Sequence, residues 1–210
     1  AVTRQHKLVD LEIEQQINTE IVGCIYKGIV KNIVPAVDGI FVDIGIGKNA
    51  FLRRKDLLNE KRFPTEGSPI LAQVIKSDTD MKGALITEKI SMLGKYAVTL
   101  SGTGYIGVSK KIRSESVRKR LKEIGKEICA EHMGLIIRTA AENADMDEFR
   151  KDITRLKENW DIIQKRFRME KSPTLLYRES DIIVKALRDY VNKGTEILIT
   201  DNRKIYERIC

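Results

Sequence analysis

The stretch Gly28-Ile-Val-Lys-Asn-Ile-Val-Pro-Ala-Val-Asp-Gly-Ile-Phe-Val-Asp-Ile-Gly-Ile-Gly-Lys-Asn-Ala-Phe-Leu52 decides the fold of this chain. Its apolar residues, many of them β-branched, fall into short runs that Pro, Asp and Gly separate. Such runs between turn residues are typical of consecutive β-strands. We therefore expect strands over about residues 23–34, 38–44 and 49–52.

Two further strand-like runs follow, at 70–76 and 83–86, after a longer insertion. Five strands over about 65 residues predict a small barrel of the OB type. Nearer the N-terminus, apolar residues mostly alternate with polar ones over 7–14, and this alternation predicts one strand of a sheet that is completed elsewhere.

The chain changes character after residue 88. Apolar residues recur four and three apart after Ser114, which can cap a helix, and again over 146–167. These patterns predict two helices, each with one apolar stripe on a core. The remaining expected elements are strands at 96–100, 107–108 and 134–138, a short apolar run at 175–177, a helix around 181–191 and a strand at 196–199. We expect this last strand to pair with the N-terminal strand, so that the barrel and the helical region are insertions into one split sheet.

The composition favours a globular protein with a polyanionic partner. The 210 residues are 42% hydrophobic, enough to bury a core, and the net charge is +8 with a pI near 9.3. Residues 89–170 hold 18 Lys plus Arg against 12 Asp plus Glu, so most of the net charge lies there. We expect a soluble cytoplasmic protein without membrane association, since neither a bilayer-spanning apolar run nor a signal-peptide block is found. Cys24, Cys129 and Cys210 are too widely spaced to indicate a disulfide framework or a zinc site.

Two aromatic residues, Phe41 and Phe51, occupy neighbouring strand runs of the expected barrel. A barrel that binds single-stranded nucleic acid needs surface aromatics for base stacking and cations for the backbone. The cations near them in the sequence are Lys27, Lys31, Lys48 and Arg53. Residue types alone leave the alternative that both phenylalanines belong to the core.

The segments 28–35, 39–45 and 49–52 resemble the S1-type RNA-binding domain, an OB-fold. The surrounding sequence resembles the ribonuclease E/G family in order along nearly the whole chain. The matching segments are Ile21-Val-Gly-Cys-Ile-Tyr-Lys-Gly28, Lys82-Gly-Ala-Leu-Ile-Thr87, Ile90-Ser-Met-Leu-Gly-Lys-Tyr96, Gly107-Val-Ser-Lys-Lys-Ile112, Gly134-Leu-Ile-Ile-Arg-Thr-Ala-Ala141, Leu187-Arg-Asp-Tyr190 and Glu196-Ile-Leu-Ile199. Of these, Ile-Ile-Arg-Thr-Ala is the most specific.

The resemblance implies an α+β multidomain fold in which an S1-type OB-fold barrel is inserted in a partial RNase H-like subdomain and is followed by a mixed α/β 5′-sensor domain. The implied boundaries are 1–20 for the N-terminal part of the RNase H-like subdomain, 21–88 for the barrel, 89–180 for the 5′-sensor domain and 181–210 for the incomplete return to the RNase H-like subdomain.

The resemblance also implies roles for individual residues. Phe41, Phe51 and Lys82 match residues that line the family's RNA channel. Arg138 and Thr139 match residues that hold a 5′-monophosphate, with help from the positions of Gly94, Val98 and Lys110. The family often has Arg where this chain has Lys110.

The chemistry of Arg138 and Thr139 suits that role, because a planar guanidinium fork and a hydroxyl can distinguish a terminal monophosphate from an internal phosphodiester. The competing interpretation is a solvated strand end with Thr139 capping the next segment.

No catalytic or metal site is expected in this chain. Paired carboxylates could hold Mg²⁺, but none of the candidates matches a metal ligand of the family: Asp43, Asp78, Asp80, Asp181, Asp189 and Asp201. The family's catalytic aspartates belong to a DNase I-like subdomain further downstream, followed by a cysteine pair that shares zinc between subunits.

We therefore expect an RNA-recognition fragment that binds single-stranded RNA, needs no cofactor and does not cut. The expected parent is a Mg²⁺-dependent endoribonuclease of RNA processing and decay that prefers 5′-monophosphorylated ends, possesses a structural zinc, and forms a homo-oligomer only as the full-length protein. The alternative is a non-enzymatic S1-type module for single-stranded RNA, which has no reason to possess the Arg138-Thr139 region.

Overall fold

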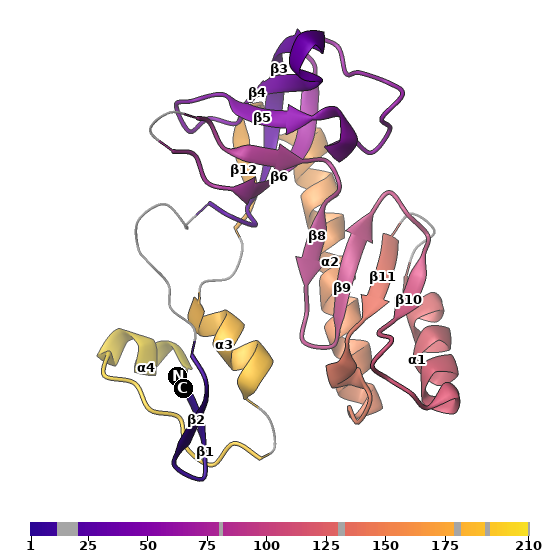
Figure 1. Cartoon of the computed structure of the whole chain (residues 1–210), viewed down its shortest axis with the longest axis vertical. Coiled ribbons are helices and arrows are strands. Elements are labelled where there is room, and N and C mark those ends of the chain that lie inside the picture. The colour runs from indigo at the N-terminus through magenta and orange to yellow at the C-terminus, as the bar shows by residue number, and fades with distance from the viewer. Residues whose placement is uncertain (12–20, 80–81, 130–132, 179–181, 192–193, 210) are drawn as a thin grey trace. The chain divides into compact units, whose positions relative to one another are not determined.

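The computed structural model describes residues 1–11, 21–79, 82–129, 133–178, 182–191 and 194–209. The chain divides into two compact units (Figure 1). One unit is formed by the two ends of the chain, Ala1–Glu20 with Ser180–Cys210, and the other by Ile21–Glu179. The larger unit is thus inserted in sequence between the two halves of the smaller one.

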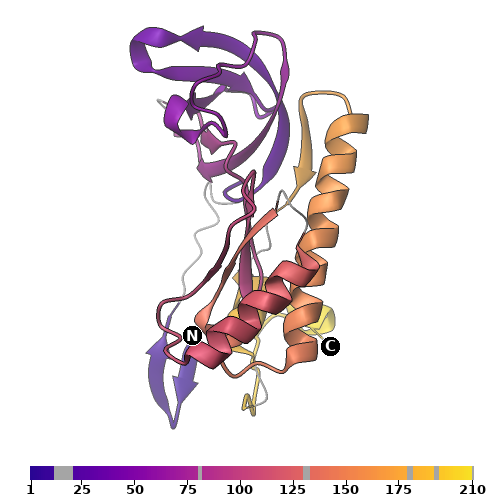
Figure 2. The same ribbon diagram turned by 90° about the vertical axis from the view of Figure 1, so that its right-hand side faces the viewer.

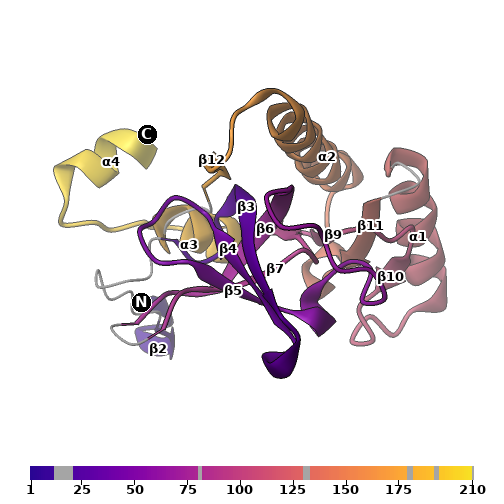
Figure 3. The ribbon, with the colours of Figure 1, turned by 90° about the horizontal axis from the view of Figure 1, so that it is seen from above.

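The larger unit begins with the predicted barrel, which the structure confirms. Its five strands are β3 (Ile25–Val34), β4 (Gly39–Asp43), β5 (Ala50–Arg53), β6 (Pro69–Lys76) and β7 (Leu85–Thr87). They follow the order β3-β4-β5-β7-β6, and a β3–β6 pairing closes the barrel. The strands β3, β4 and β5 run side by side in Figure 3.

The alternation of apolar residues explains why these segments close into a barrel. In β4, Ile40 and Val42 are fully buried, and in β5 the same holds for Ala50 and Leu52. Their side chains fill the barrel interior, so the intervening residues of both strands point outward.

A sixth strand, β12 (Thr174–Tyr177), joins this sheet from far along the chain. It pairs with the first half of β3, with Thr174 opposite Lys27. This half of β3 is the part that β4, which pairs from Ile29 onward, leaves unpaired. The apolar run expected at 175–177 is therefore a strand of the barrel sheet.

The α/β region of the larger unit is a four-stranded sheet covered by two helices. The sheet order is β10-β11-β9-β8. Its elements are β8 (Ser91–Leu93), β9 (Ala97–Ser101), β10 (Ile106–Val108), α1 (Glu115–Ile128), β11 (Met133–Ile137) and α2 (Met146–Met169). Both helices lie on one face of the sheet (Figure 2), where their apolar stripes join the buried core. All were predicted except β8.

The smaller unit contradicts one prediction. The N-terminal strand β2 (Lys7–Asp10) pairs with β1 (Val2–Arg4) in a hairpin, and residues 196–199 form no strand. Ile197 and Ile199 are 74% and 88% exposed. The predicted pairing of these two segments is therefore wrong among the described residues; residues 12–14 of the expected N-terminal strand lie outside them. A local hairpin closes a far shorter loop than a partner almost 190 residues away, and so costs less conformational entropy.

The same unit contains two helices, α3 (Ile182–Tyr190), which was predicted, and α4 (Arg203–Ile209), which was not. The hydroxyl of Tyr190 donates a hydrogen bond of 2.7 Å to Asp10 Oδ2, which links the two ends of the chain. Across the described residues of both units, none of the helices combines the length and the apolar character that a membrane span requires.

Candidate nucleic-acid interface

The two predicted aromatic residues of the barrel lie together on its outer face. Phe41 in β4 pairs directly with Phe51 in β5, and their ring centroids are 5.4 Å apart with an interplanar angle of 53°. Both side chains are half-buried, and neither belongs to the barrel core. The structure therefore places both rings where a base could reach them, and gives no support to the alternative that they are core residues.

Two glycines make this face possible. A Cβ atom at Gly39 would lie 2.3 Å from Phe51 Cε2, so the ring occupies the space that any larger residue would need. A Cβ at Gly83 would lie 1.9 Å from the carbonyl oxygen of Asn49, which shows how closely this segment approaches β5. The approach lets Phe51 N donate to Ala84 O at 2.7 Å, and it brings Gly83, the neighbour of the exposed Lys82, against the start of the strand that contains Phe51.

The four cations named from the sequence have different partners, and one of them, Arg53, pairs with Asp56 at 2.5 Å. Lys31 lies 3.5 Å from Asp43 in β4, the strand that contains Phe41, and Lys48 Nζ donates to Thr79 O at 2.9 Å. Lys27 instead donates to the carbonyl oxygen of Glu170 at 2.6 Å and lies 5.1 Å from the Phe167 ring centroid. Lys27 therefore ties the barrel to α2 and does not border Phe41 and Phe51.

The second candidate site lies where two parallel strands end. β10 and β11 run in parallel, so Ser109 and Thr139 follow them at the same edge of the sheet. Ser109 N donates to Ile137 O at 2.8 Å, and the hydroxyl oxygens of Ser109 and Thr139 are 3.0 Å apart. The exposed Lys110 comes directly after Ser109. Ser109 was not predicted, because its place beside Thr139 depends on the parallel pairing.

Arg138 is held at this edge by the turn between β8 and β9. Its Nη1 donates to Gly94 O at 2.8 Å and to Lys95 O at 3.1 Å, and its backbone N donates to Tyr96 O at 2.8 Å. The structure thus brings Arg138 and Gly94 together, as the resemblance implies. Val98 in β9 lies opposite Ile136 in β11, two residues before Arg138.

A buried carboxylate that sequence reasoning missed shapes this turn. Asp152 in α2 is 7% exposed and accepts hydrogen bonds from Lys95 N at 3.2 Å and Tyr96 N at 2.8 Å. A Cβ at Gly94 would lie 2.5 Å from Asp152 Oδ2, so the turn needs a glycine there. The signal was available, because Asp152 is three residues from Phe149 and four from Leu156 in the apolar stripe of α2.

The side chain of Tyr96 adds a second tie to the same helix. Its hydroxyl donates to Glu148 Oε2 at 2.6 Å. Burial, together with this hydrogen bond, raises the pKa of Tyr96, so its hydroxyl stays protonated and keeps donating. The turn that holds Arg138 is therefore fixed to α2 at two points.

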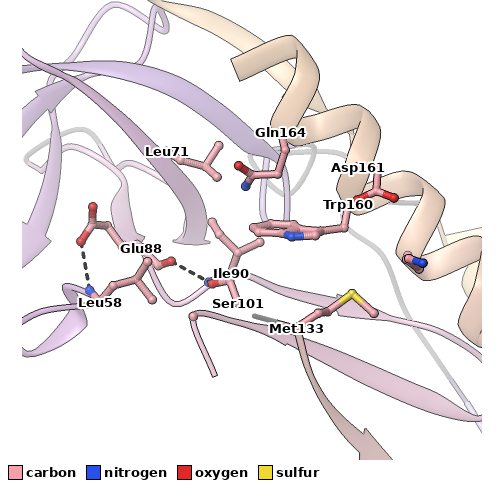
Figure 4. Close-up of a pocket in the computed structure, with 11 residues that line it drawn as sticks. Leu58, Leu71, Glu88, Ile90, Ser101, Met133, Trp160, Asp161 and Gln164 are labelled. Atoms are coloured by element: carbon pink, nitrogen blue, oxygen red, sulfur yellow. Dashed lines mark hydrogen bonds between the residues drawn. The ribbon is translucent and has the colours of Figure 1, made fainter. Parts of the chain in front are cut away.

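A cavity of about 330 Å³ lies where the barrel meets the α/β region (Figure 4). Trp160 and Gln164 of α2 face Leu71 and Ile90 across it. Glu88 accepts a hydrogen bond from Leu58 N at 3.0 Å, and burial raises the pKa of the Glu88 carboxyl. The lining is mainly apolar and contains none of the predicted site residues.

The described carboxylates among those considered as metal ligands form no cluster with one another. Within the described ranges, no three His, Cys, Asp or Glu side chains form a group that could hold a metal ion. Asp43 is engaged by Lys31 and by Gly45 N, while Asp80 and Asp181 lie outside the described residues.

Comparison with known proteins gives two family matches. Residues 20–87 match the S1 RNA binding domain, and residues 91–210 match the ribonuclease E/G family. Ribonuclease G of Escherichia coli K12 is 34% identical over 96% of this chain, and ribonuclease G of Haemophilus influenzae is 32% identical over 100%. Ribonuclease E of Buchnera aphidicola subsp. Schizaphis graminum is 31% identical over 99% of this chain.

This chain spans less than half the length of these relatives: 45% and 46% of the two ribonuclease G proteins and 23% of the ribonuclease E. The second family match covers more than half of the chain and includes both the turn at Gly94 and the edge at Arg138. From its S1-type barrel to its C-terminus, this chain belongs to the ribonuclease E/G family.

Proposed function

We propose that this chain is the RNA-recognition part of an endoribonuclease and that it binds single-stranded RNA across the barrel face. The observation that carries the proposal is the outward pair of Phe41 and Phe51, with the exposed Lys82 next to Gly83, which closely approaches Asn49 directly before β5. Rings exposed on a barrel surface can stack on bases of any sequence, and the neighbouring cations can contact the phosphates.

We further propose that Arg138 and Thr139 read the 5′ end of the RNA, with Gly94, Val98 and Lys110 completing the site. The convergence of a guanidinium, two hydroxyls and an exposed Lys at one edge supports this role. A terminal monophosphate offers more charge and more acceptor oxygens than a phosphodiester, so such a cluster favours it.

The whole protein, in this proposal, cleaves single-stranded RNA in cytoplasmic RNA processing and decay. Its relatives are named ribonucleases, and this chain spans less than half of their length. We assign the Mg²⁺-dependent hydrolysis, the structural zinc and the homo-oligomer contacts to the longer protein, and RNA binding without cleavage to this chain.

The test is a binding titration with three labelled oligonucleotides of one sequence: 5′-monophosphorylated single strand, 5′-hydroxyl single strand and duplex. The expected order of affinity is the order in which they are named, and raising the salt should weaken all three. Equal affinity for both single strands would favour the alternative of a plain single-strand-binding module. Equal affinity for the duplex would refute the barrel-face site.

A further inference from the structure

Among the described residues of the larger unit, one face of the four-stranded sheet has exposed apolar side chains. The helix-covered face is formed by buried residues such as Met92, Leu135 and Ile137. Because side chains alternate along a strand, their neighbours point to the opposite face. There Leu93, Val98 and Ile136 stand in register across three strands, and Leu93 and Ile136 are 36% and 39% exposed. This register produces an apolar row across the open face.

Tyr105 lies directly before the fourth strand, β10, and ends this row. Its ring folds over Gly107, the residue that pairs with Ile136: a Cβ at Gly107 would lie 2.7 Å from Tyr105 Cε1. The backbone is fixed, because Leu135 N donates to Tyr105 O at 2.8 Å. The side chain is 64% exposed, and its hydroxyl makes no hydrogen bond with any described residue. A large aromatic surface is thus held in place with one side open to solvent.

The row lies next to the candidate phosphate site. Side chains two residues apart lie on the same face of a strand. On β10 and the residues that flank it, one face is therefore formed by Tyr105, Gly107 and Ser109. On β11 and the residue after it, the same holds for Ile136 and Arg138. The ring lies over Gly107, which is two residues before Ser109. Two residues of strand span about 7 Å, so the ring lies within roughly one nucleotide of the hydroxyl pair. Polar groups suited to a phosphate therefore adjoin an aromatic surface suited to a base.

We propose that Tyr105 is the stacking platform for the base of the 5′-terminal nucleotide, whose phosphate lies at Arg138 and Thr139. This inference rests on the proposed function and adds a contact to the base. A nucleobase fits this face better than a protein partner does. Three apolar side chains and one ring fall far short of the about 20–30 residues that each side of a stable protein interface contributes, and the exposed Lys110, Lys111 and Arg113 nearby match a polyanion.

The experiment measures the affinity of the 210-residue chain and its variants for two 5′-monophosphorylated single strands, one intact and one with an abasic first nucleotide. Tyr105→Ala should weaken binding of the intact strand by between about fivefold and a hundredfold, the range that base–aromatic stacking gives. Tyr105→Phe keeps the ring and should bind as the unmutated chain does. Tyr206→Ala removes another exposed tyrosine, 60% exposed, in the other unit and should have no effect.

The abasic strand identifies the contact. If Tyr105 stacks on the first base, Tyr105→Ala and the unmutated chain should bind the abasic strand with equal affinity. An equal loss with both strands would overturn the inference, and so would equal binding of the intact strand by Tyr105→Ala and the unmutated chain.

These failures are separable from failure of the proposed function. If the unmutated chain prefers 5′-monophosphorylated RNA while Tyr105→Ala has no effect, only the inference falls. If the unmutated chain binds no RNA, both fall. A change in sedimentation of Tyr105→Ala with unchanged RNA affinity would identify the open face as a protein interface and would also overturn the inference. Thermal unfolding of Tyr105→Phe beside Tyr105→Ala shows whether a loss comes from misfolding.

Discussion

Arg138 is a structural tie, and in the proposed function it also reads the RNA end. Its Nη1 is shared by the carbonyl oxygens of Gly94 and Lys95. These contacts fix the plane of the guanidinium, and a planar fork is what a terminal phosphate recognises. The affinity for the 5′ end should therefore depend on geometry as well as on charge.

Replacement of Arg138 by Lys tests this dependence. Arg138→Lys keeps the charge and loses the fork, so the preference for 5′-monophosphorylated over 5′-hydroxyl RNA should fall by about tenfold or more, since a charge-assisted hydrogen bond contributes roughly 1.5–3 kcal/mol. Fluorescence anisotropy with both oligonucleotides measures it. The 5′-hydroxyl affinity, which depends on the barrel, should stay nearly constant. A preference that survives the substitution would locate the sensor elsewhere.

Asp152 in α2 stabilises the turn between β8 and β9 that holds Arg138. In Asp152→Ala the backbone N–H groups of Lys95 and Tyr96 lose their acceptor, and an unsatisfied buried donor costs about 1–3 kcal/mol. Urea denaturation should show this loss in the free energy of unfolding. Asp161→Ala is the matched control, because Asp161 is exposed on the same helix. Equal stability of the two variants would show that the turn does not depend on Asp152.

At the scale of the elements, the β4–β5 pair presents Phe41 and Phe51 as one surface. Phe41→Ala or Phe51→Ala should weaken RNA binding by about 1–3 kcal/mol if a base stacks there. Phe63→Ala is the control, since Phe63 lies in the loop between β5 and β6, with Arg54 4.7 Å from its ring centroid. A variant that unfolds at a much lower temperature while its folded fraction binds normally would show that the ring is structural.

Substitution of Lys82 should change RNA binding, whereas substitution of Lys27 should change stability. Lys82→Ala should lower RNA affinity and flatten its salt dependence by about one charge, since the exposed Lys82 adjoins Gly83, which approaches the start of β5. Lys27→Ala should lower the free energy of unfolding instead, because Lys27 binds Glu170 O and the Phe167 ring. Salt titrations and urea denaturation of both variants separate the roles. An effect of Lys27→Ala on the salt dependence alone would contradict its structural assignment.

Elements with a regular period could be predicted, and long-range neighbours could not. Alternation and helical spacing located the barrel strands, α1 and α2, but β8 has only three residues, too few to show a period. Phe41, Phe51 and Arg138 were identified through the family resemblance. Ser109 was missed because its position beside Thr139 depends on a parallel strand pair, which spacing does not reveal. Asp152 was missed although its helical spacing to Phe149 and Leu156 places it on the apolar stripe of α2.

At the scale of the whole molecule, this chain should bind RNA and leave it intact. The resemblance places the catalytic aspartates outside these residues. Incubation of 5′-monophosphorylated single-stranded RNA with the chain and Mg²⁺ should yield no cleavage products on a denaturing gel. Cleavage that copurifies with the chain and disappears in Asp78→Asn would contradict the prediction and would place the chemistry in the barrel.

The pairing of β12 with β3 limits how far the barrel is a separable module. Truncation after residue 88 would keep all five barrel strands and yet remove the partner of Tyr26 and Lys27 on β3. It would also uncover Ile25, which is fully buried in the core of the α/β region. A bare strand edge next to an apolar surface favours aggregation. Excising this S1-type domain for expression or fusion therefore requires residues up to Tyr177, because the smallest portable piece is the whole unit and not the barrel.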